Sequence, residues 1–70
     1  MNLKEIRKAL SVSQSELARK IGVSQGAVSM WEKGRRIPKV TDFPKIAAAL
    51  NVPVEQVLEC FIKKTEKEGA

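Results

Sequence analysis

The sequence predicts an all-α fold in which five short helices form one compact bundle. Apolar residues recur at spacings of three and four in five separate segments, which is the period of a helix with one buried face. Residue types that favour helix starts precede these segments, and glycine or asparagine follows three of them. A chain of 70 residues has room for one small core, so the five helices are expected to share it.

The first two helices have clear start signals. A helix over residues 3 to 9 or 10 follows Asn2, a candidate N-cap, and Glu5 stands where a capping box requires a carboxylate. The next helix follows Ser13, which forms the same pattern with Glu16, and it ends at Gly22, which can adopt a left-handed conformation without strain. The side chains expected to be buried are Leu3, Ile6 and Leu10 in the first helix and Leu17, Ala18 and Ile21 in the second.

A third helix is predicted close behind the second, over about residues 25 to 33. Ser24 is its candidate N-cap, Gly34 ends it as Gly22 ends the second helix, and Val28 and Trp31 lie on its inner face. Two helices joined by so short a turn cannot lie antiparallel and must cross steeply. Over residues 13–34 this is the geometry of a helix-turn-helix, which places its second helix in the major groove of DNA.

Two further helices complete the bundle. One is predicted over residues 42–50, with Thr41 or Asp42 as the cap and Pro44 in the first turn, and the other begins after Pro53. Their expected core residues are Phe43, Ile46, Ala47 and Leu50 in the fourth helix and Val54, Val57, Leu58, Phe61 and Ile62 in the fifth. These elements define one domain over residues 1–62, and the polar residues 63–70 are expected to fray.

Positive charge is concentrated in the first part of the chain. Residues 1–40 contain nine Lys or Arg and three Glu, a net charge of +6, whereas residues 41–70 contain four Lys and five acidic residues, a net charge of −1. A one-sided positive excess is typical of a protein that binds a polyanion. For charge alone, a solvated surface with a chance excess of lysine is the alternative, and the helix-turn-helix pattern favours the first interpretation.

The composition argues against several other classes. There is no histidine or tyrosine and only one cysteine, and the carboxylates are scattered as in surface ion pairs, so no enzyme, metal site or cofactor is expected. No ligand pocket can be argued, so no small-molecule ligand is expected. No segment has the length of a membrane span or the pattern of a signal peptide, and a single cysteine fits a reducing compartment. The expected location is the cytoplasm, for a bacterial or phage-encoded protein.

The outer side of the third helix carries the candidate base-reading residues. Gln25, at the leading end, can both donate to and accept from the edge of adenine. Met30 can pack on a thymine methyl group, and Gly26 would let the backbone approach the groove wall closely. The predicted base-reading set is Gln25, Gly26, Ser29 and Met30.

Candidate phosphate-binding residues surround the third helix. Four cations lie beside its exit, where they would hold the DNA backbone without reading sequence; the alternative is a solvated basic loop. Helix N-termini also attract phosphate, because they expose unpaired N–H groups with a positive partial charge. The predicted set is Gln14 and Ser24 at two helix starts, with Lys33, Arg35, Arg36 and Lys39 in the basic segment.

With these elements in register, the chain resembles the Cro and phage-repressor (XRE-like) family of helix-turn-helix proteins. The matching positions are Gln14, Leu17, Ala18, Ile21, Gly22, Val28, the run Trp-Glu-x-Gly-Arg-x-x-Pro over residues 31–38, and the segments 43–50 and 54–58. The resemblance covers nearly the whole chain up to about residue 62. It implies a lambda-repressor-like fold.

The resemblance implies three further roles. Gln14 would add a side-chain hydrogen bond to the DNA backbone. Arg7 and Glu32 align with an arginine and a glutamate that pair in some of these repressors; plain surface charge is the alternative for Arg7. Relatives bind near-palindromic sites as dimers, and the apolar end of the fifth helix is the expected contact between copies, formed by Cys60, Phe61 and Ile62.

The expected function is therefore sequence-specific binding of double-stranded DNA by a transcriptional regulator. We predict a repressor that occupies its operator as a homodimer and blocks polymerase. One alternative is an antitoxin or a restriction–modification controller of the same fold. The other is a protein-interaction module that kept the fold and lost DNA binding, against which the retained Gln25, Arg35, Arg36 and Lys39 argue.

Overall fold

The computed structural model describes residues 2–61, which form five helices and no strand. The helices are α1 (Leu3–Ala9), α2 (Gln14–Ile21), α3 (Gln25–Glu32), α4 (Asp42–Leu50) and α5 (Val54–Phe61). The predicted all-α fold is confirmed, and the helix boundaries agree with the expected ones to within one residue. Ile62 and the predicted tail, residues 63–70, lie outside the described residues.

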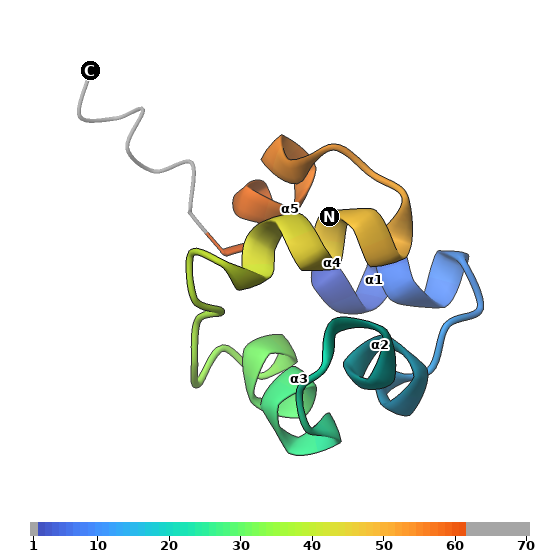
Figure 1. The fold of residues 1–70 in the computed structure, drawn as a ribbon, viewed down its shortest axis with the longest axis vertical. Coiled ribbons are helices and arrows are strands. Elements are labelled where there is room, and N and C mark those ends of the chain that lie inside the picture. Colours follow the sequence, from blue (N-terminus) through green and yellow to red (C-terminus); the bar gives the residue numbers. More distant parts are fainter. Residues whose placement is uncertain (1, 62–70) are drawn as a thin grey trace.

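The helices are arranged so that α3 lies at the edge of the bundle. In Figure 1, α2 and α3 lie at one end of the long axis, α5 lies at the other end, and α4 runs between them. The closest packing is between α2 and α3, between α4 and α5, and between α2 and α4. The helix-turn-helix pair therefore contacts α4 mainly through α2, and the side of α3 that faces away from the bundle is uncovered by other helices.

One core joins all five helices. Leu17, Val28, Ile46 and Val57 are fully buried and come from four different helices. The other core residues are Leu3, Ile6, Ala18, Ile21, Trp31, Phe43, Ala47 and Leu50. In α5 only Val57 is fully buried, so the predicted apolar stripe of this helix is only partly used by the core.

Leu10 was expected in the core, and this prediction is wrong: its side chain is 48% exposed. The physical reason is that α1 ends at Ala9 and Leu10 is its C-cap. The next residue, Ser11, has a left-handed backbone with φ of 59°, so the chain turns away before Leu10 can continue the helical stripe.

The helix starts are capped largely as predicted. Asn2 and Glu5 form a complete capping box on α1, with bonds of 2.9 and 3.0 Å. Ser13 accepts from the N–H of Glu16, but within residues 2–61 no return bond from the Glu16 carboxylate completes that box. The predicted side-chain cap of α4 is absent, because Thr41 makes no cap bond and the Asp42 carboxylate accepts from the N–H of Lys39 instead.

Four helices end in the same way, at a residue with a left-handed backbone. These residues are Ser11, Gly22, Gly34 and Asn51, with φ of 59°, 79°, 77° and 57°. After each one, the next N–H donates to the carbonyl five residues earlier in the chain, at 3.0 Å in all four cases. This bond satisfies a carbonyl that the end of a helix would otherwise leave unpaired. The cap at Ser11 was not predicted.

Candidate nucleic-acid interface

The leading end of α3 is exposed and fixed in place. Ser24 caps the helix by accepting from the N–H of Ala27 at 3.1 Å, and Val28 and Trp31 anchor the opposite side in the core. Figure 1 shows α3 at the periphery of the bundle, beside α2. A short helix held in this way can enter a groove without rearrangement of the fold.

The four predicted base-reading residues differ in exposure. Gln25 and Gly26 are exposed, whereas Ser29 and Met30 are half-buried. A Cβ atom added at Gly26 would meet only the Ser24 hydroxyl, at 3.8 Å. The most accessible part of the predicted reading surface is therefore the first turn of α3.

The amide of Gln25 is held by two residues of α2. Its Oε1 accepts from the Ser15 hydroxyl at 2.9 Å, and its Nε2 donates to Gln14 Oε1 at 3.4 Å. Gln14 also donates from Nε2 to Glu32 Oε1 at 2.9 Å. Gln14, predicted to bind phosphate, thus lies between the start of α3 and its end. Ser15 was missed by sequence reasoning, because nothing in the sequence indicates which side chain its hydroxyl faces.

Arg7 and Glu32 form a buried ion pair between α1 and the end of α3. Arg7 Nε donates to Glu32 Oε2 at 2.7 Å and Nη2 donates to Oε1 at 3.1 Å, while Nη1 donates to the Val12 carbonyl at 2.9 Å. The two side chains are only 9% and 4% exposed. Such a two-bond contact fixes direction as well as distance, so the pair holds α3 against α1.

The ion pair shifts the pKa values of both Arg7 and Glu32. Burial alone would raise the pKa of Glu32, but the hydrogen bonds from Arg7 and Gln14 and the charge of Arg7 outweigh it, so this pKa lies below the ordinary glutamate value. The hydrogen bond with Glu32 raises the pKa of Arg7. Glu32 is therefore an ionised acceptor at neutral pH.

The segment from Lys33 to Asp42 presents the predicted phosphate-binding cations. Lys33, Arg35, Arg36 and Lys39 are all exposed, as is Ser24 at the other end of α3. Pro38 is buried. The bond from the Lys39 N–H to the Asp42 carboxylate (3.0 Å) and the bond from the Asp42 N–H to the Lys39 carbonyl (2.8 Å) fix the end of this segment. The cations thus lie on an anchored segment beside α3, residues 33–41, which we call the basic loop.

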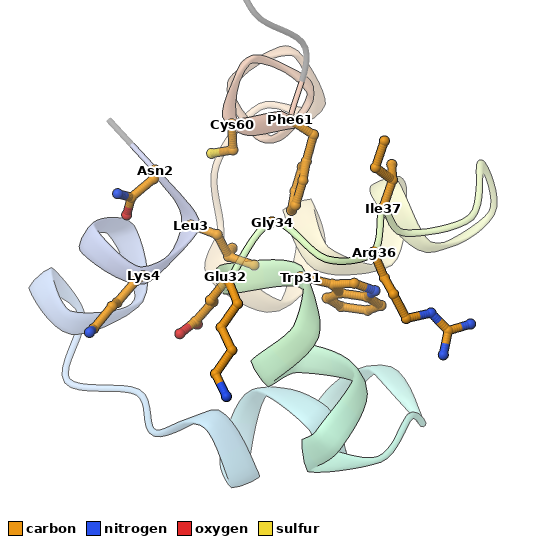
Figure 2. Close-up of a pocket in the computed structure, with 11 residues that line it drawn as sticks. Asn2, Leu3, Lys4, Trp31, Glu32, Gly34, Arg36, Ile37, Cys60 and Phe61 are labelled. Atoms are coloured by element: carbon orange, nitrogen blue, oxygen red, sulfur yellow. The ribbon is translucent and has the colours of Figure 1, made fainter.

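Trp31 lies next to this loop and lines a hollow together with Arg36 and Lys39. The Trp31 side chain is 6% exposed, which confirms its predicted position on the inner face of the third helix. It also lines a hollow of about 280 Å³ between α1, the end of α3 and α5. In Figure 2 Leu3, Cys60 and Phe61 face this hollow, and the guanidinium of Arg36 points away from it. The hollow lies at the end of α3, so Gln25 takes no part in it.

The predicted dimer contact is partly occupied by the chain's own core. Phe61 packs edge-on against Phe43, with ring centroids 5.8 Å apart, and Cys60 donates from Sγ to the Gln56 carbonyl at 3.4 Å. Burial raises the pKa of the Cys60 thiol. Both residues are half-buried, and the third predicted residue, Ile62, lies outside the described residues.

A different surface is strongly apolar. We define the apolar patch as the lining of a shallow depression of about 480 Å³ between the basic loop, the start of α4 and α5, formed by Ile37, Pro38, Val40, Phe43, Pro44, Val54 and Leu58. Within it, Ile37 is 69% exposed and Val40 is 84% exposed. These two residues were not predicted as part of a surface, because isolated apolar residues in a loop have no periodicity.

The described part of the chain has neither a cluster of metal ligands nor a helix that could span a membrane. Among residues 2–61, no three His, Cys, Asp or Glu side chains gather as a metal site requires. None of the five helices has the length and apolar character needed to cross a bilayer.

Comparison with known proteins identifies the family. Residues 3–57 match the helix-turn-helix family HTH_3. The chain is 35% identical over 68 residues to an uncharacterized HTH-type transcriptional regulator of Methanothermobacter thermautotrophicus, an alignment that covers 97% of this chain and 93% of the relative. It is 42% identical over 48 residues to an uncharacterized HTH-type transcriptional regulator of Archaeoglobus fulgidus, covering 69% of this chain and 21% of the relative.

A phage repressor is also similar. The cryptic phage CTXphi transcriptional repressor RstR of Vibrio cholerae is 31% identical over 51 residues, covering 73% of this chain and 46% of RstR. The chain thus spans less than half the length of several curated relatives that it matches. No solved structure matches it significantly. With the family match over residues 3–57 and the closely packed α2–α3 pair, the chain belongs to the XRE-type helix-turn-helix (HTH_3) family of DNA-binding transcriptional regulators.

Proposed function

We propose that this protein binds double-stranded DNA sequence-specifically and represses transcription from a near-palindromic operator, which it occupies as a homodimer. One observation carries the proposal: α3, whose first turn is exposed, is followed directly by a loop with four exposed cations, and two of these, Arg36 and Lys39, line one hollow with Ala27 of that first turn. The similarity to RstR, a transcriptional repressor by name, supports the direction of regulation.

We assign base recognition and phosphate binding to different residues. Gln25, with Gly26, Ser29 and Met30 behind it, would face base edges in the major groove. Lys33, Arg35, Arg36 and Lys39, with Gln14 and Ser24 at the helix starts, would contact phosphates. The base contacts would supply the specificity of this arrangement, and the phosphate contacts would supply most of the affinity.

We further propose that two copies meet through the apolar patch. On a two-fold operator the two α3 helices would lie about 34 Å apart, in successive major grooves. The patch adjoins the basic loop, so a second copy on it would keep both loops near the same stretch of DNA. Val40 and Ile37 are the most exposed large apolar side chains among the described residues, and a second copy would remove them from water.

The patch is too small for a dimer that is stable without DNA. It consists of seven residues, whereas a stable interface contains about 20–30 residues on each side. We therefore expect a monomer in solution and a dimer on the operator. Cys60 and Phe61, which lie at the end of α5 outside the apolar patch, are the alternative surface for the contact between copies.

The test of sequence reading begins with selection of bound sequences from a random duplex pool at low ionic strength. The expected result is a two-fold symmetric site. Gln25→Ala should then lose preference at one base pair in each half-site, by about 5- to 150-fold, since a bidentate contact discriminates by about 1–3 kcal/mol. Failure of every duplex to bind at low salt would overturn the proposal and favour a protein-interaction module.

The test of phosphate binding uses the salt dependence of the dissociation constant. Arg35→Ala should weaken all duplexes alike and reduce the slope of log K against log salt by about 0.9. Lys8→Ala is the matched control: it removes an exposed cation of α1, outside the predicted set, and should leave the slope nearly unchanged. If Gln25→Ala and Arg35→Ala behaved identically, the division between reading and holding would be wrong.

A further inference from the structure

The side-chain amide of Gln25 is held on both sides by the first turn of α2. Ser15 donates to Gln25 Oε1 at 2.9 Å, and Gln14 Oε1 accepts from Gln25 Nε2 at 3.4 Å. Ser15 is free for this contact because a different serine, Ser13, caps α2. The Ser15 hydroxyl is therefore not needed to start the helix.

The order of donors and acceptors in this contact is set by the buried ion pair. A guanidinium can only donate and an ionised carboxylate can only accept, so Arg7 and Glu32 have one possible polarity. Gln14 must turn its Nε2 towards the Glu32 carboxylate, at 2.9 Å, which leaves its Oε1 for the next side chain. This bond therefore sets the donor and the acceptor in the two bonds that Gln25 makes with Gln14 and Ser15.

The same constraint passes to Gln25. Because Gln14 presents an oxygen, Gln25 must turn its Nε2 towards Gln14 and its Oε1 towards Ser15, whose hydroxyl then donates. In the reversed orientation the Oε1 of Gln25 would face the Oε1 of Gln14, two acceptors with no proton between them. The chain of bonds thus favours one orientation of the Gln25 amide.

We propose that Ser15 is a positioning residue that makes Gln25 selective for adenine over guanine. The inference rests on the proposed role of Gln25 as a base reader. After its two intramolecular bonds, the Gln25 amide keeps one N–H and one oxygen lone pair. Side by side, these match the N7 acceptor and the N6 donor of adenine.

Guanine presents an acceptor, O6, where adenine has its amino group. An amide held by Ser15 would set its Oε1 against this O6, acceptor against acceptor. A mobile amide could rotate and direct Nε2 to the O6 instead. Ser15 therefore acts through Gln25 and changes selectivity, while the phosphate contacts and the general affinity are independent of it.

The experiment compares Ser15→Ala with Ser15→Thr, which retains the hydroxyl. Dissociation constants are measured on two duplexes that differ only at the base pair where Gln25→Ala loses its preference, A·T in one and G·C in the other. Ser15→Ala should reduce the preference for A·T about fivefold, the effect of one neutral hydrogen bond. Ser15→Thr should retain it, and both variants should keep the wild-type salt slope.

A second measurement needs no DNA. The side-chain ¹⁵N relaxation of Gln25 in the free protein should report a rigid amide in the wild type and in Ser15→Thr, and a mobile one in Ser15→Ala. An unchanged base preference and an unchanged amide mobility in Ser15→Ala would overturn the role proposed for Ser15 and leave the proposed function intact. Absence of binding to every duplex would overturn the proposed function and, with it, the selectivity role.

Discussion

At the scale of single residues, Gly26 distinguishes what the fold requires from what a bound partner requires. Its backbone is ordinary helix, and an added Cβ would meet only the Ser24 hydroxyl, at 3.8 Å. The free protein therefore gains nothing from glycine here, and a glycine within a helix costs about 0.5–1 kcal/mol relative to alanine. A close approach of the α3 backbone to DNA would account for the missing side chain.

Gly26→Ala should separate stability from binding. We expect the free energy of unfolding to rise by about 0.5–1 kcal/mol, measured by urea denaturation, because alanine restricts the unfolded chain and favours the helix. We expect operator binding to weaken, because the new methyl group would face the groove wall. An equally tight complex would show that the glycine plays no part in recognition.

Glu32 makes the free energy of unfolding depend on pH. Its pKa in the folded protein lies below the ordinary value, so the unfolded chain binds a proton more readily. The stabilisation is therefore fully present above the ordinary glutamate pKa, about 4.3, and is lost as the pH falls through the lower folded value. Thermal melts between pH 7 and pH 2 should show this loss.

Glu32→Gln should be less stable at neutral pH, because the Arg7 guanidinium would remain buried without its charged partner. The variant should also lose less stability than the wild type on acidification. Glu55→Gln, at an exposed position of α5, is the matched control and should follow the wild type. Parallel acid profiles for wild type and Glu32→Gln would contradict the assigned role of the ion pair.

At the scale of helices, a residue with a left-handed backbone ends four of the five described helices. All four left-handed caps make the same 3.0 Å backbone bond, but two use glycine and two use residues with a Cβ atom. The left-handed conformation costs a residue with a Cβ atom about 1–2 kcal/mol, and glycine avoids this cost. Ser11 and Gly22 thus form a natural pair for comparison.

Ser11→Gly should stabilise the protein and Gly22→Ala should destabilise it, each by about 1 kcal/mol in urea denaturation. Nothing lies within 4 Å of a Cβ atom added at Gly22, so the loss there would be conformational and not steric. Operator binding by Ser11→Gly should equal that of the wild type. A stabilising Gly22→Ala would show that the turn between α2 and α3 has another conformation.

The same helix ends show how far the sequence predicts this fold. Glycine at positions 22 and 34 and asparagine at position 51 have recognisable preferences, so these three ends were predicted. Serine has no such preference, so the cap at Ser11 was missed, and Leu10 was wrongly placed in the core. The side-chain cap predicted for α4 was wrong, because the Asp42 carboxylate can serve either its own helix or the Lys39 N–H before it, and the sequence does not distinguish the two.

Prediction of the candidate site has a similar limit. The exposed position of Gln25 and of the basic loop follows from helical periodicity and charge, which are local properties of the sequence. The contact of Ser15 with Gln25 depends on the angle at which α2 crosses α3, because these residues are ten positions apart and approach only in the folded chain. Side-chain orientation across two helices is a property of the packing, and no single segment encodes it.

At the scale of the whole molecule, the apolar patch connects proposed dimer formation with proposed phosphate binding. It extends from the basic loop, through Ile37 and Val40, to Val54 and Leu58 of α5. A second copy seated there would therefore be coupled to the segment that we propose to bind phosphate. Because the patch is small, binding of each chain to its half-site would have to supply part of the free energy of dimer formation.

Val40→Asn should weaken the dimer without changing the affinity of a single chain for DNA. We expect sedimentation to show monomers of both wild type and variant when free, and two wild-type chains on a palindromic duplex. The variant should bind a single half-site with the wild-type dissociation constant and lose cooperativity on the full site, because burial of Val40 is what the second copy gains. Leu10→Asn, the same kind of change at an exposed apolar residue outside the patch, should keep full cooperativity. Equal cooperativity in both variants would place the contact elsewhere, with the end of α5 as the next surface to test.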